Sequence, residues 1–294
     1  MPAVHPREPL IGPTLNPMPL TRRRVRTLAV IAASVVALTG TILGVPAADA
    51  GGSPTNAAKV FRWGSATWHD EFHSSSPDPM WQTSPAGAVT NRHGMLTLAA
   101  SSGTTTASVP GQAQQYGRWE ARIRSSERTH GGKHYRVALR LVPVDDQTCG
   151  RRDIVISQYS AAGDRVHVFL RNGDLQFKYG QPVTVRDNSF HTYAVEVTPT
   201  HISWFMDTKV IMTERRPRAR TGETYIAQFD LTPPPSATAD TRMNTTWMQM
   251  DWMRYYTLAR PNAKSISAPR AHRQADPVGC SGKVSPKPLT RLVG

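Results

Sequence analysis

The sequence has few charged residues, few cysteines and almost no long apolar segments. Only 19% of its 294 residues are charged and two are cysteines, whereas it holds 24 prolines and 21 glycines. No long helical pattern and no internal repeat are present. This composition argues against two helical domains and favours one β-rich globular domain with appended segments.

The one long apolar run, residues 28–45, lies near the N-terminus. It is followed by the small-residue sequence Ala48-Asp49-Ala50 and preceded by the basic residues Arg22, Arg23, Arg24 and Arg26. This order predicts an export signal over residues 1–50. An uncleaved anchor is the alternative, since about 18 apolar residues can span a bilayer. We therefore expect a secreted or cell-envelope protein, with no integral membrane domain once the signal is removed.

Export would permit a disulfide bond, and the two cysteines are Cys149 and Cys280. Oxidised pairing is common outside the cytosol, so these residues are a candidate bridge. Two separate thiols remain the alternative.

The chain is basic, with 35 Lys and Arg against 21 Asp and Glu, a net charge of +14. Anionic partners are therefore expected, but no nucleic-acid-binding module accompanies the charge. His191 and His201 lack the spacing of metal ligands and are interpreted as structural. No cofactor is predicted, and a structural Ca²⁺ is conceivable in such a domain but not indicated by any motif.

Residues 60–258 contain short runs of alternating apolar and polar residues. Within 134–141 the odd-numbered residues are apolar or aromatic and the even-numbered ones include Arg136 and Arg140, which is typical of a half-buried strand. Asn172-Gly173 and Pro199-Thr200 separate further runs and indicate hairpins. Residues 51–59 are predicted to be a linker. Residues 259–294 are predicted to form a largely flexible basic Pro/Ser-rich tail, suited to an anionic cell envelope.

Five segments in the same order resemble glycoside hydrolase family 16, the laminarinase and β-glucanase group. They are DEF at 70–72 with Asp78 and Trp81, NRHGMLTL at 91–98, YGRWEARIR at 116–124, SFHTYAVEVTPTHISWFMD at 189–207 and MQMDWMRY at 248–255. The resemblance implies an all-β jelly-roll β-sandwich (concanavalin A-like) of two packed antiparallel sheets. We expect a monomer.

The family's catalytic strand, G-E-I-D-I-x-E, aligns without gaps on residues 150–156. The nucleophile position then holds Arg151, the helper position Asp153 and the acid/base position Ile156, or Val155 in shorter variants of the motif. Retaining glycosidases need two carboxyl groups about 5–5.5 Å apart. A guanidinium cannot attack carbon and an aliphatic side chain has no proton to give, so this alignment predicts a divergent member that lacks both catalytic glutamates.

Three functions remain open. The first is a protein that binds polysaccharide, of an anionic kind, in a degenerate cleft without hydrolysis, through Arg136, Arg140, Arg151 and Asp153; these Arg side chains could instead only neutralise Asp153. The second is an active glycosidase on β-glucan-type polymers that uses Glu120, Asp145 or Asp146 as relocated acids. The third is a lyase on an anionic polysaccharide, with Arg binding the sugar carboxylate and Tyr135 or His134 moving the proton.

Overall fold

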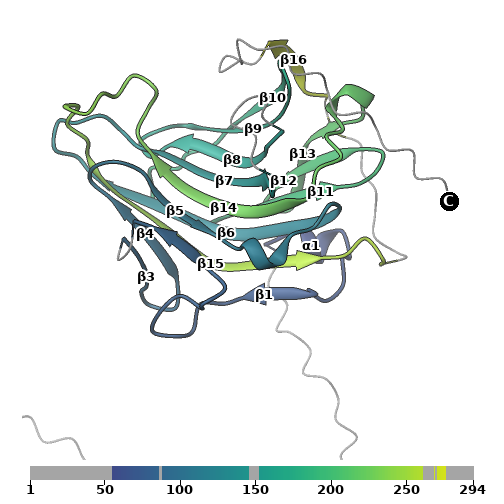
Figure 1. Ribbon diagram of the computed structural model, residues 1–294, viewed down its shortest axis with the longest axis horizontal. Coiled ribbons are helices and arrows are strands. Elements are labelled where there is room, and N and C mark those ends of the chain that lie inside the picture. Colours follow the sequence, from purple (N-terminus) through teal and green to yellow (C-terminus); the bar gives the residue numbers. More distant parts are fainter. Residues whose placement is uncertain (1–54, 86–87, 146–151, 261–267, 269, 276–294) are drawn as a thin grey trace, which may run out of the picture. The chain divides into compact units, whose positions relative to one another are not determined.

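Two antiparallel sheets packed face to face make up the described part of the chain in our computed structural model (Figure 1). The structure describes residues 55–85, 88–145, 152–260, 268 and 270–275. The predicted export signal, Asp146, Arg151 and both cysteines lie outside these residues. The predicted all-β jelly-roll sandwich is confirmed.

We call the two layers sheet A and sheet B. Sheet A has the order β13-β12-β11-β6-β15-β4-β3, with β1 also paired to β15. Its strands are β1 (Trp68–Asp70), β3 (Val89–Asn91), β4 (Leu96–Ala100), β6 (Gly117–Arg128), β11 (His191–Val197), β12 (Ile202–Met206), β13 (Lys209–Glu214) and β15 (Thr245–Tyr256).

Sheet B has the order β16-β10-β9-β8-β7-β14-β5-β2. Its strands are β2 (Gln82–Ser84), β5 (Thr105–Ser108), β7 (Arg136–Pro143), β8 (Ile154–Ser160), β9 (Arg165–Asn172), β10 (Leu175–Pro182), β14 (Tyr225–Thr232) and β16 (His272–Ala275). The short helices are α1 (Ala57–Val60), η1 (Pro110–Gln112) and η2 (Pro217–Ala219).

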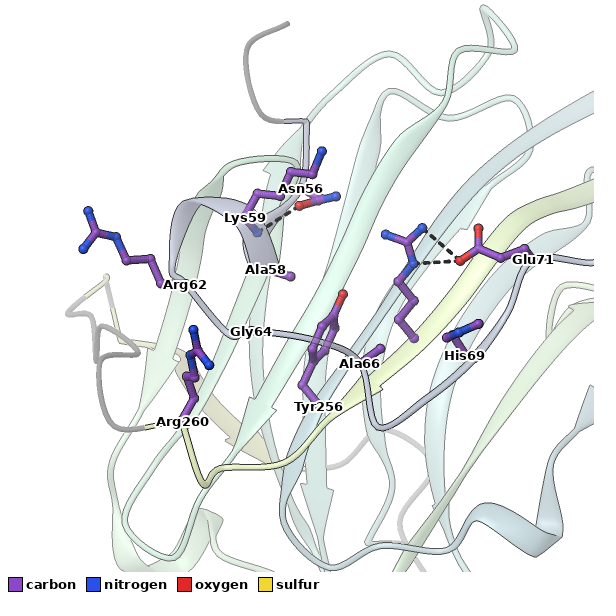
Figure 2. Close-up of a pocket in the computed structure, with 11 residues that line it drawn as sticks. Asn56, Ala58, Lys59, Arg62, Gly64, Ala66, His69, Glu71, Tyr256 and Arg260 are labelled. Atoms are coloured by element: carbon purple, nitrogen blue, oxygen red, sulfur yellow. Dashed lines mark hydrogen bonds and ion pairs between the residues drawn. The ribbon is translucent and has the colours of Figure 1, made fainter. Parts of the chain in front are cut away.

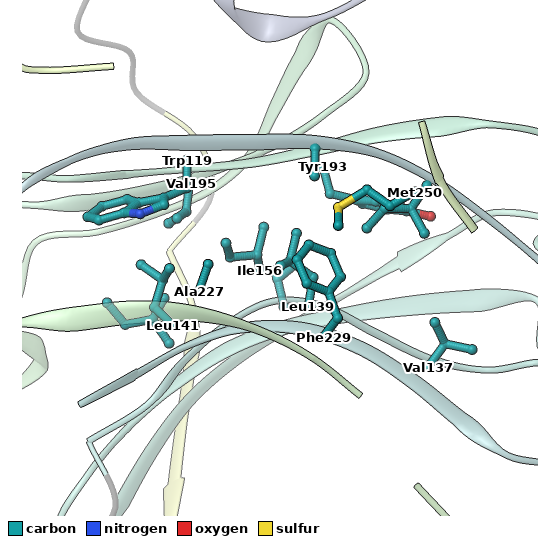
Figure 3. Close-up of a cluster of buried hydrophobic side chains, with 14 of the residues drawn as sticks. Trp119, Val137, Leu139, Leu141, Ile156, Tyr193, Val195, Ala227, Phe229 and Met250 are labelled. Carbon is teal, nitrogen blue, oxygen red and sulfur yellow. The ribbon is translucent and has the colours of Figure 1, made fainter. Parts of the chain in front are cut away.

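The core lies between the sheets and is built from one side of each strand. Sheet B contributes Val137, Leu139 and Leu141 from β7, together with Ile156, Ala227 and Phe229, and sheet A contributes Trp119, Tyr193, Val195 and Met250 (Figure 3). Because side chains alternate along a strand, the intervening residues of sheet B point away from sheet A. We call this side the outer face of sheet B.

The predicted hairpins are present. In the β9–β10 hairpin Asn172 pairs with Leu175, so the connection is Gly173-Asp174, and Gly173 adopts φ +66° as a tight turn requires. β11 and β12 pair around Pro199-Thr200, and Asp207 turns the chain into β13.

Two ordered elements occur where the sequence predicted linker and tail. Helix α1 begins inside the predicted linker, residues 51–59, and ends one residue beyond it. Its Ala57 and Ala58 are buried against Phe205 and Tyr256 on the outer side of sheet A. Strand β16 lies inside the predicted tail and pairs with β10, with Leu175 opposite Ala275. Neither the small residues of the linker nor the basic composition of the tail indicated these contacts.

A bilayer-spanning helix is absent from the residues that the structure describes. Within the same residues no group of three His, Cys, Asp or Glu side chains is arranged to hold a metal ion.

Candidate functional site

Strand β8 contains residues 154–156, the end of the segment that resembles the family's catalytic strand, and it has a bulge there. Arg140 pairs with Val155 and Leu139 with Ser157, so Ile156 is the extra residue on β8. The pairing with β9 shifts over the same residues, from Val155 opposite Phe169 to Gln158 opposite His167. A bulge changes which side chains face outward beyond it.

The bulge determines the residues that β8 presents on the outer face of sheet B. Ile154, Ile156 and Tyr159 belong to the core between the sheets. Asp153 pairs with side chains of the outer face, and Gln158 is half-buried opposite Ala138. The Trp204 indole donates a hydrogen bond to the Val155 carbonyl (2.9 Å), which satisfies an acceptor at the bulge from across the core.

Asp153 is buried and held by cations. Its Oδ2 accepts a hydrogen bond from Nη1 of Arg171 at 2.9 Å and lies 4.0 Å from Nη1 of Arg140. The Arg171 guanidinium also lies over the Phe169 ring at 4.9 Å. The Asp153 side chain is only 5% exposed, so these arginines supply the charge compensation that water would otherwise provide.

Arg140 lies between two acidic residues on different strands. Its Nε donates to Oδ2 of Asp230 at 2.6 Å, and its Nη1 faces Asp153. Asp230 is buried on β14 and also accepts a hydrogen bond from the Gln228 side chain (2.8 Å). The Arg140 side chain keeps 27% exposure, so the guanidinium remains accessible to a ligand.

The outer face of sheet B is electropositive. Burial, with Lys178 and Arg165 nearby, lowers the pKa of His167. Burial, with Arg171 nearby, lowers the pKa of Lys178. Burial is the larger cause of both shifts, and the neighbouring cations act in the same direction. The described cations on this face are Arg136, Arg140, Arg165, Arg171 and Lys178, and the carboxylates are Asp153 and Asp230.

The structure brings some of the predicted site residues together. Arg136, Arg140 and Asp153 share the outer face, and Asp153 and Arg140 are in ion-pair distance. Ile156 has no exposed surface and faces the core, so it is not on the predicted binding surface. Arg151 lies outside the described residues.

Of the predicted replacement acids, Glu120 does not lie beside Asp153, and Asp146 lies outside the described residues. Glu120 is on β6 of sheet A, where it accepts hydrogen bonds from the backbone N–H groups of Ala57 (2.7 Å) and Ala58 (3.2 Å). It therefore faces α1, not the cleft strand. Asp145 is exposed in the loop after β7.

The residues predicted for a lyase are also separated. Tyr135 is fully buried in the core, where burial raises its pKa. The His134 imidazole Nδ1 is within hydrogen-bond distance of Oε1 of Glu127 on β6, at 2.5 Å.

Several residues of this face escaped sequence analysis. The odd-numbered residues of β9 include Arg165, His167 and Arg171, and they alternate with Val166, Val168 and Leu170 of the core. The alternation of apolar and polar residues along β9 predicted its inward apolar residues, and the same alternation could have identified the outward polar ones. Asp230 is 90 residues from Arg140 in the sequence, and no local pattern could predict their contact.

Comparisons with known proteins agree with the two-sheet fold. The model for Glycosyl hydrolases family 16 matches residues 74–257. The laminarinase from Rhodothermus marinus is 19% identical with TM-score 0.53, and the match covers 65% of this chain and 96% of that one. The catalytic domain of an endo-1,3-β-glucanase (laminarinase) from Thermotoga petrophila is 13% identical with TM-score 0.57, over 67% of this chain and 98% of that one.

The laminarinase from Flavobacterium sp. UMI-01 is 16% identical with TM-score 0.54, and the match covers 66% of this chain and all of that one, 100%. At these identities the structural matches establish the fold alone. A search of curated protein sequences returned no match.

Proposed function

Since the chain belongs to glycosyl hydrolase family 16, we propose that it binds an anionic polysaccharide on the outer face of sheet B without hydrolysing it. The observation that carries the proposal is the state of Asp153, which is buried and compensated by Arg171 and Arg140. Five cations against two carboxylates on this face favour a polymer with carboxylate or other acidic groups.

The bulge in β8 supports a different alignment of the family's catalytic motif. Shifted by two residues, G-E-I-D-I-x-E places its two Ile on Ile154 and Ile156, which both face the core. The nucleophile position is then Asp153, the helper position Val155 and the acid/base position Gln158. A glutamine side chain cannot act as a general acid, so this alignment again leaves the pair of catalytic carboxylates incomplete.

Electrostatics on this face also disfavours hydrolysis. Oδ2 of Asp153 is directed at the guanidinium groups of Arg171 and Arg140 instead of at a sugar carbon. The same guanidinium groups are suited to bidentate recognition of a carboxylate on a ligand. Loss of cleavage and gain of anion binding therefore have one physical cause.

The remaining parts of the proposal concern cellular context. Residues 1–50 act as an export signal, and residues 60–258 form the binding domain of a monomer. The basic tail, residues 259–294, assists attachment to an anionic cell envelope. The basic n-region, apolar run and small-residue cleavage sequence support export.

A paired binding and hydrolysis screen tests the proposed function. Purified protein is titrated with alginate-type polyuronates and with the neutral polymers laminarin and lichenan, and reducing ends are measured in parallel. We expect saturable binding of the polyuronate without new reducing ends. Turnover of any of these polymers by wild type that disappears in Asp153→Ala would show that the protein cleaves polysaccharide.

The second candidate is an active glycosidase, and one observation favours it. Asp153 and Asp230 both approach Arg140 and thus form a pair of acidic groups on one face. In this mechanism both carboxylates are required, so Asp153→Asn and Asp230→Asn would each abolish turnover. Equal residual rates in wild type and both variants would exclude it.

A further inference from the structure

A second basic pocket lies on the outer side of sheet A, away from the proposed polysaccharide surface. It has a volume of about 560 Å³ and is formed where α1 and the loop after it approach β1 and the end of β15. Ligand sites commonly measure about 300–1,000 Å³, so the pocket can hold one sugar-sized ligand. Figure 2 shows Lys59, Arg62 and Arg260 on one side, Glu71 and His69 on the other, and Tyr256 between them.

The charges around this pocket are unequal. Four cationic side chains line it, namely Lys59, Arg62, Arg254 and Arg260, against one acid, Glu71. Arg254 already pairs with Glu71 (2.9 Å) and lies over the Trp252 ring at 4.2 Å. Among the described residues neither Arg62 nor Arg260 forms an ion pair, so two exposed guanidinium groups are available at the rim.

The loop that carries Arg62 is held in place by buried aromatic residues. Trp63 is 2% exposed and packs edge-on against Phe205 and Tyr256, with ring centroids 5.2 and 5.6 Å apart. Its backbone N–H also donates to the Ala58 carbonyl at 3.0 Å. Arg62 is therefore presented by an anchored turn, which reduces the entropy lost when a ligand is bound.

The backbone of this loop is shaped around the pocket. Gly64 has φ +87°, and a Cβ atom there would lie 3.2 Å from Cδ of Arg260, so glycine allows the arginine to lie against the loop. Ala58, Gly64 and Ala66 have small or no side chains and leave the space open. The ring of Tyr256, buried among α1 and Phe205, forms an apolar base.

We infer that this pocket binds an oxyanion carried by a sugar-sized ligand, such as a phosphate or carboxylate group, through Arg62 and Arg260. Guanidinium groups recognise such oxyanions through paired charge-assisted hydrogen bonds. The inference does not depend on the proposed polysaccharide surface, which is on the other sheet.

The test compares a charge-removing variant with a matched control. Arg62→Asn/Arg260→Gln removes both rim charges, and Asn is chosen because it tolerates the left-handed φ of +57° at position 62. Arg92→Gln/Arg128→Gln removes two exposed arginines elsewhere in sheet A and its turns. Each protein is titrated at constant ionic strength with inorganic phosphate, glucuronate and glucose, while amide resonances of Gly64 and Ala66 are followed.

We expect saturable shifts with phosphate and glucuronate in wild type and control, and a dissociation constant about tenfold higher in the pocket variant. Glucose should cause no saturable shift. Phosphate binding without glucuronate binding would restrict the site to phosphoryl groups, and the reverse would restrict it to carboxylates; either result supports the inference. Coincident titrations for the three proteins, no saturable shift with either anion, or glucose binding as tight as glucuronate binding would overturn it.

Discussion

Glu120 is a buried carboxyl group that joins two distant parts of the chain. It has no exposed surface, and its Oε1 accepts hydrogen bonds from Ala57 and Ala58 of α1. Burial raises its pKa to about 7, although the two backbone N–H groups and the charge of Arg254 act in the opposite direction. The Glu120 carboxyl group is therefore neutral in slightly acidic solution and negatively charged above neutral pH.

This shift predicts how stability depends on pH. Between about pH 4.5 and 7 the folded protein binds more protons at Glu120 than the unfolded chain, so the unfolding free energy decreases as pH rises through this interval, by roughly 3 kcal/mol. The side chain in Glu120→Gln is neutral at every pH, so it does not contribute to this pH dependence. Relative to wild type, the unfolding free energy of the variant should therefore increase by about 2–3 kcal/mol between pH 5 and pH 8, measured by denaturant unfolding. An equal difference between the two proteins at both pH values would contradict the prediction.

Arg140 compensates two carboxylates at once, so its loss should be costly. Arg140→Met keeps the aliphatic length but leaves Asp230, 2% exposed, without its 2.6 Å partner. Removing one member of a buried pair costs about 3–5 kcal/mol, and since Arg140 is 27% exposed we expect about 2–3 kcal/mol. Thermal and denaturant unfolding would measure it.

The double variant Arg140→Met/Asp230→Asn is the control, because it removes the unpaired charge. It should recover at least about half of the lost stability. Additive losses from the two single substitutions would show that the ion pair is not coupled.

At the scale of elements, the sequence predicted where strands occur better than it predicted which strands pair with one another. The alternation in 134–141 and the Asn172-Gly173 turn located β7 and the β9–β10 hairpin because both signals are local. Sheet order is set by contacts between distant residues, and the β6 strand that carries Glu120 pairs with β11 and β15 in sheet A, so it is not a neighbour of β8.

The same limit explains the misplacement of Ile156. Alternation counted from Asp153 places Ile156 with Ile154 in the core, and the one-residue bulge in β8, which depends on pairing with β7, brings Gln158 to the outer face instead. The repeated Ile-x-Ile of residues 154–156 was a usable sign of the inward row. The ion pairs of the site, such as Arg140 with Asp230, could not be predicted because they form only when the strands assemble into the sheet.

Strand β16 covers the edge of sheet B and should contribute to stability. It pairs with β10 over Leu175–Lys178, and the preceding Ala271 is buried and accepts a hydrogen bond from Arg216 (2.7 Å). A chain that ends at Arg270 would expose the β10 edge, which favours association with other edges. We expect a loss of about 1–3 kcal/mol, from several hydrogen bonds worth about 0.5–1.5 kcal/mol each, and greater aggregation on heating.

A chain that ends at Ala275 is the matched control for this truncation, since it keeps β16. Light scattering and calorimetry should find it equivalent to the full chain. If the shorter truncation is equally stable and soluble, β16 does not protect the edge.

At the scale of the whole molecule, charge is distributed so that both sheets carry cationic surfaces facing outward. The +14 net charge creates a field that attracts polyanions, and its effect beyond about 8–10 Å is screened by salt. Affinity for a polyuronate should therefore fall at least about tenfold between 50 and 300 mM NaCl, whereas any binding of neutral laminarin should change little. Affinity electrophoresis or calorimetry would measure both.

The pH dependence of this binding follows from His167. Its pKa is lowered by burial and by Lys178 and Arg165, so the ring is neutral at pH 7 in the unbound protein. A bound polyanion would offset that repulsion and raise the pKa, so protons are taken up on binding and affinity must increase as pH falls from 7 to 5. His167→Gln should bind normally at pH 7 and lose most of the increase at pH 5. An increase that persists unchanged in His167→Gln would show that His167 is not its cause, and would separate the role of the imidazole from that of the Arg140 cluster on the same face.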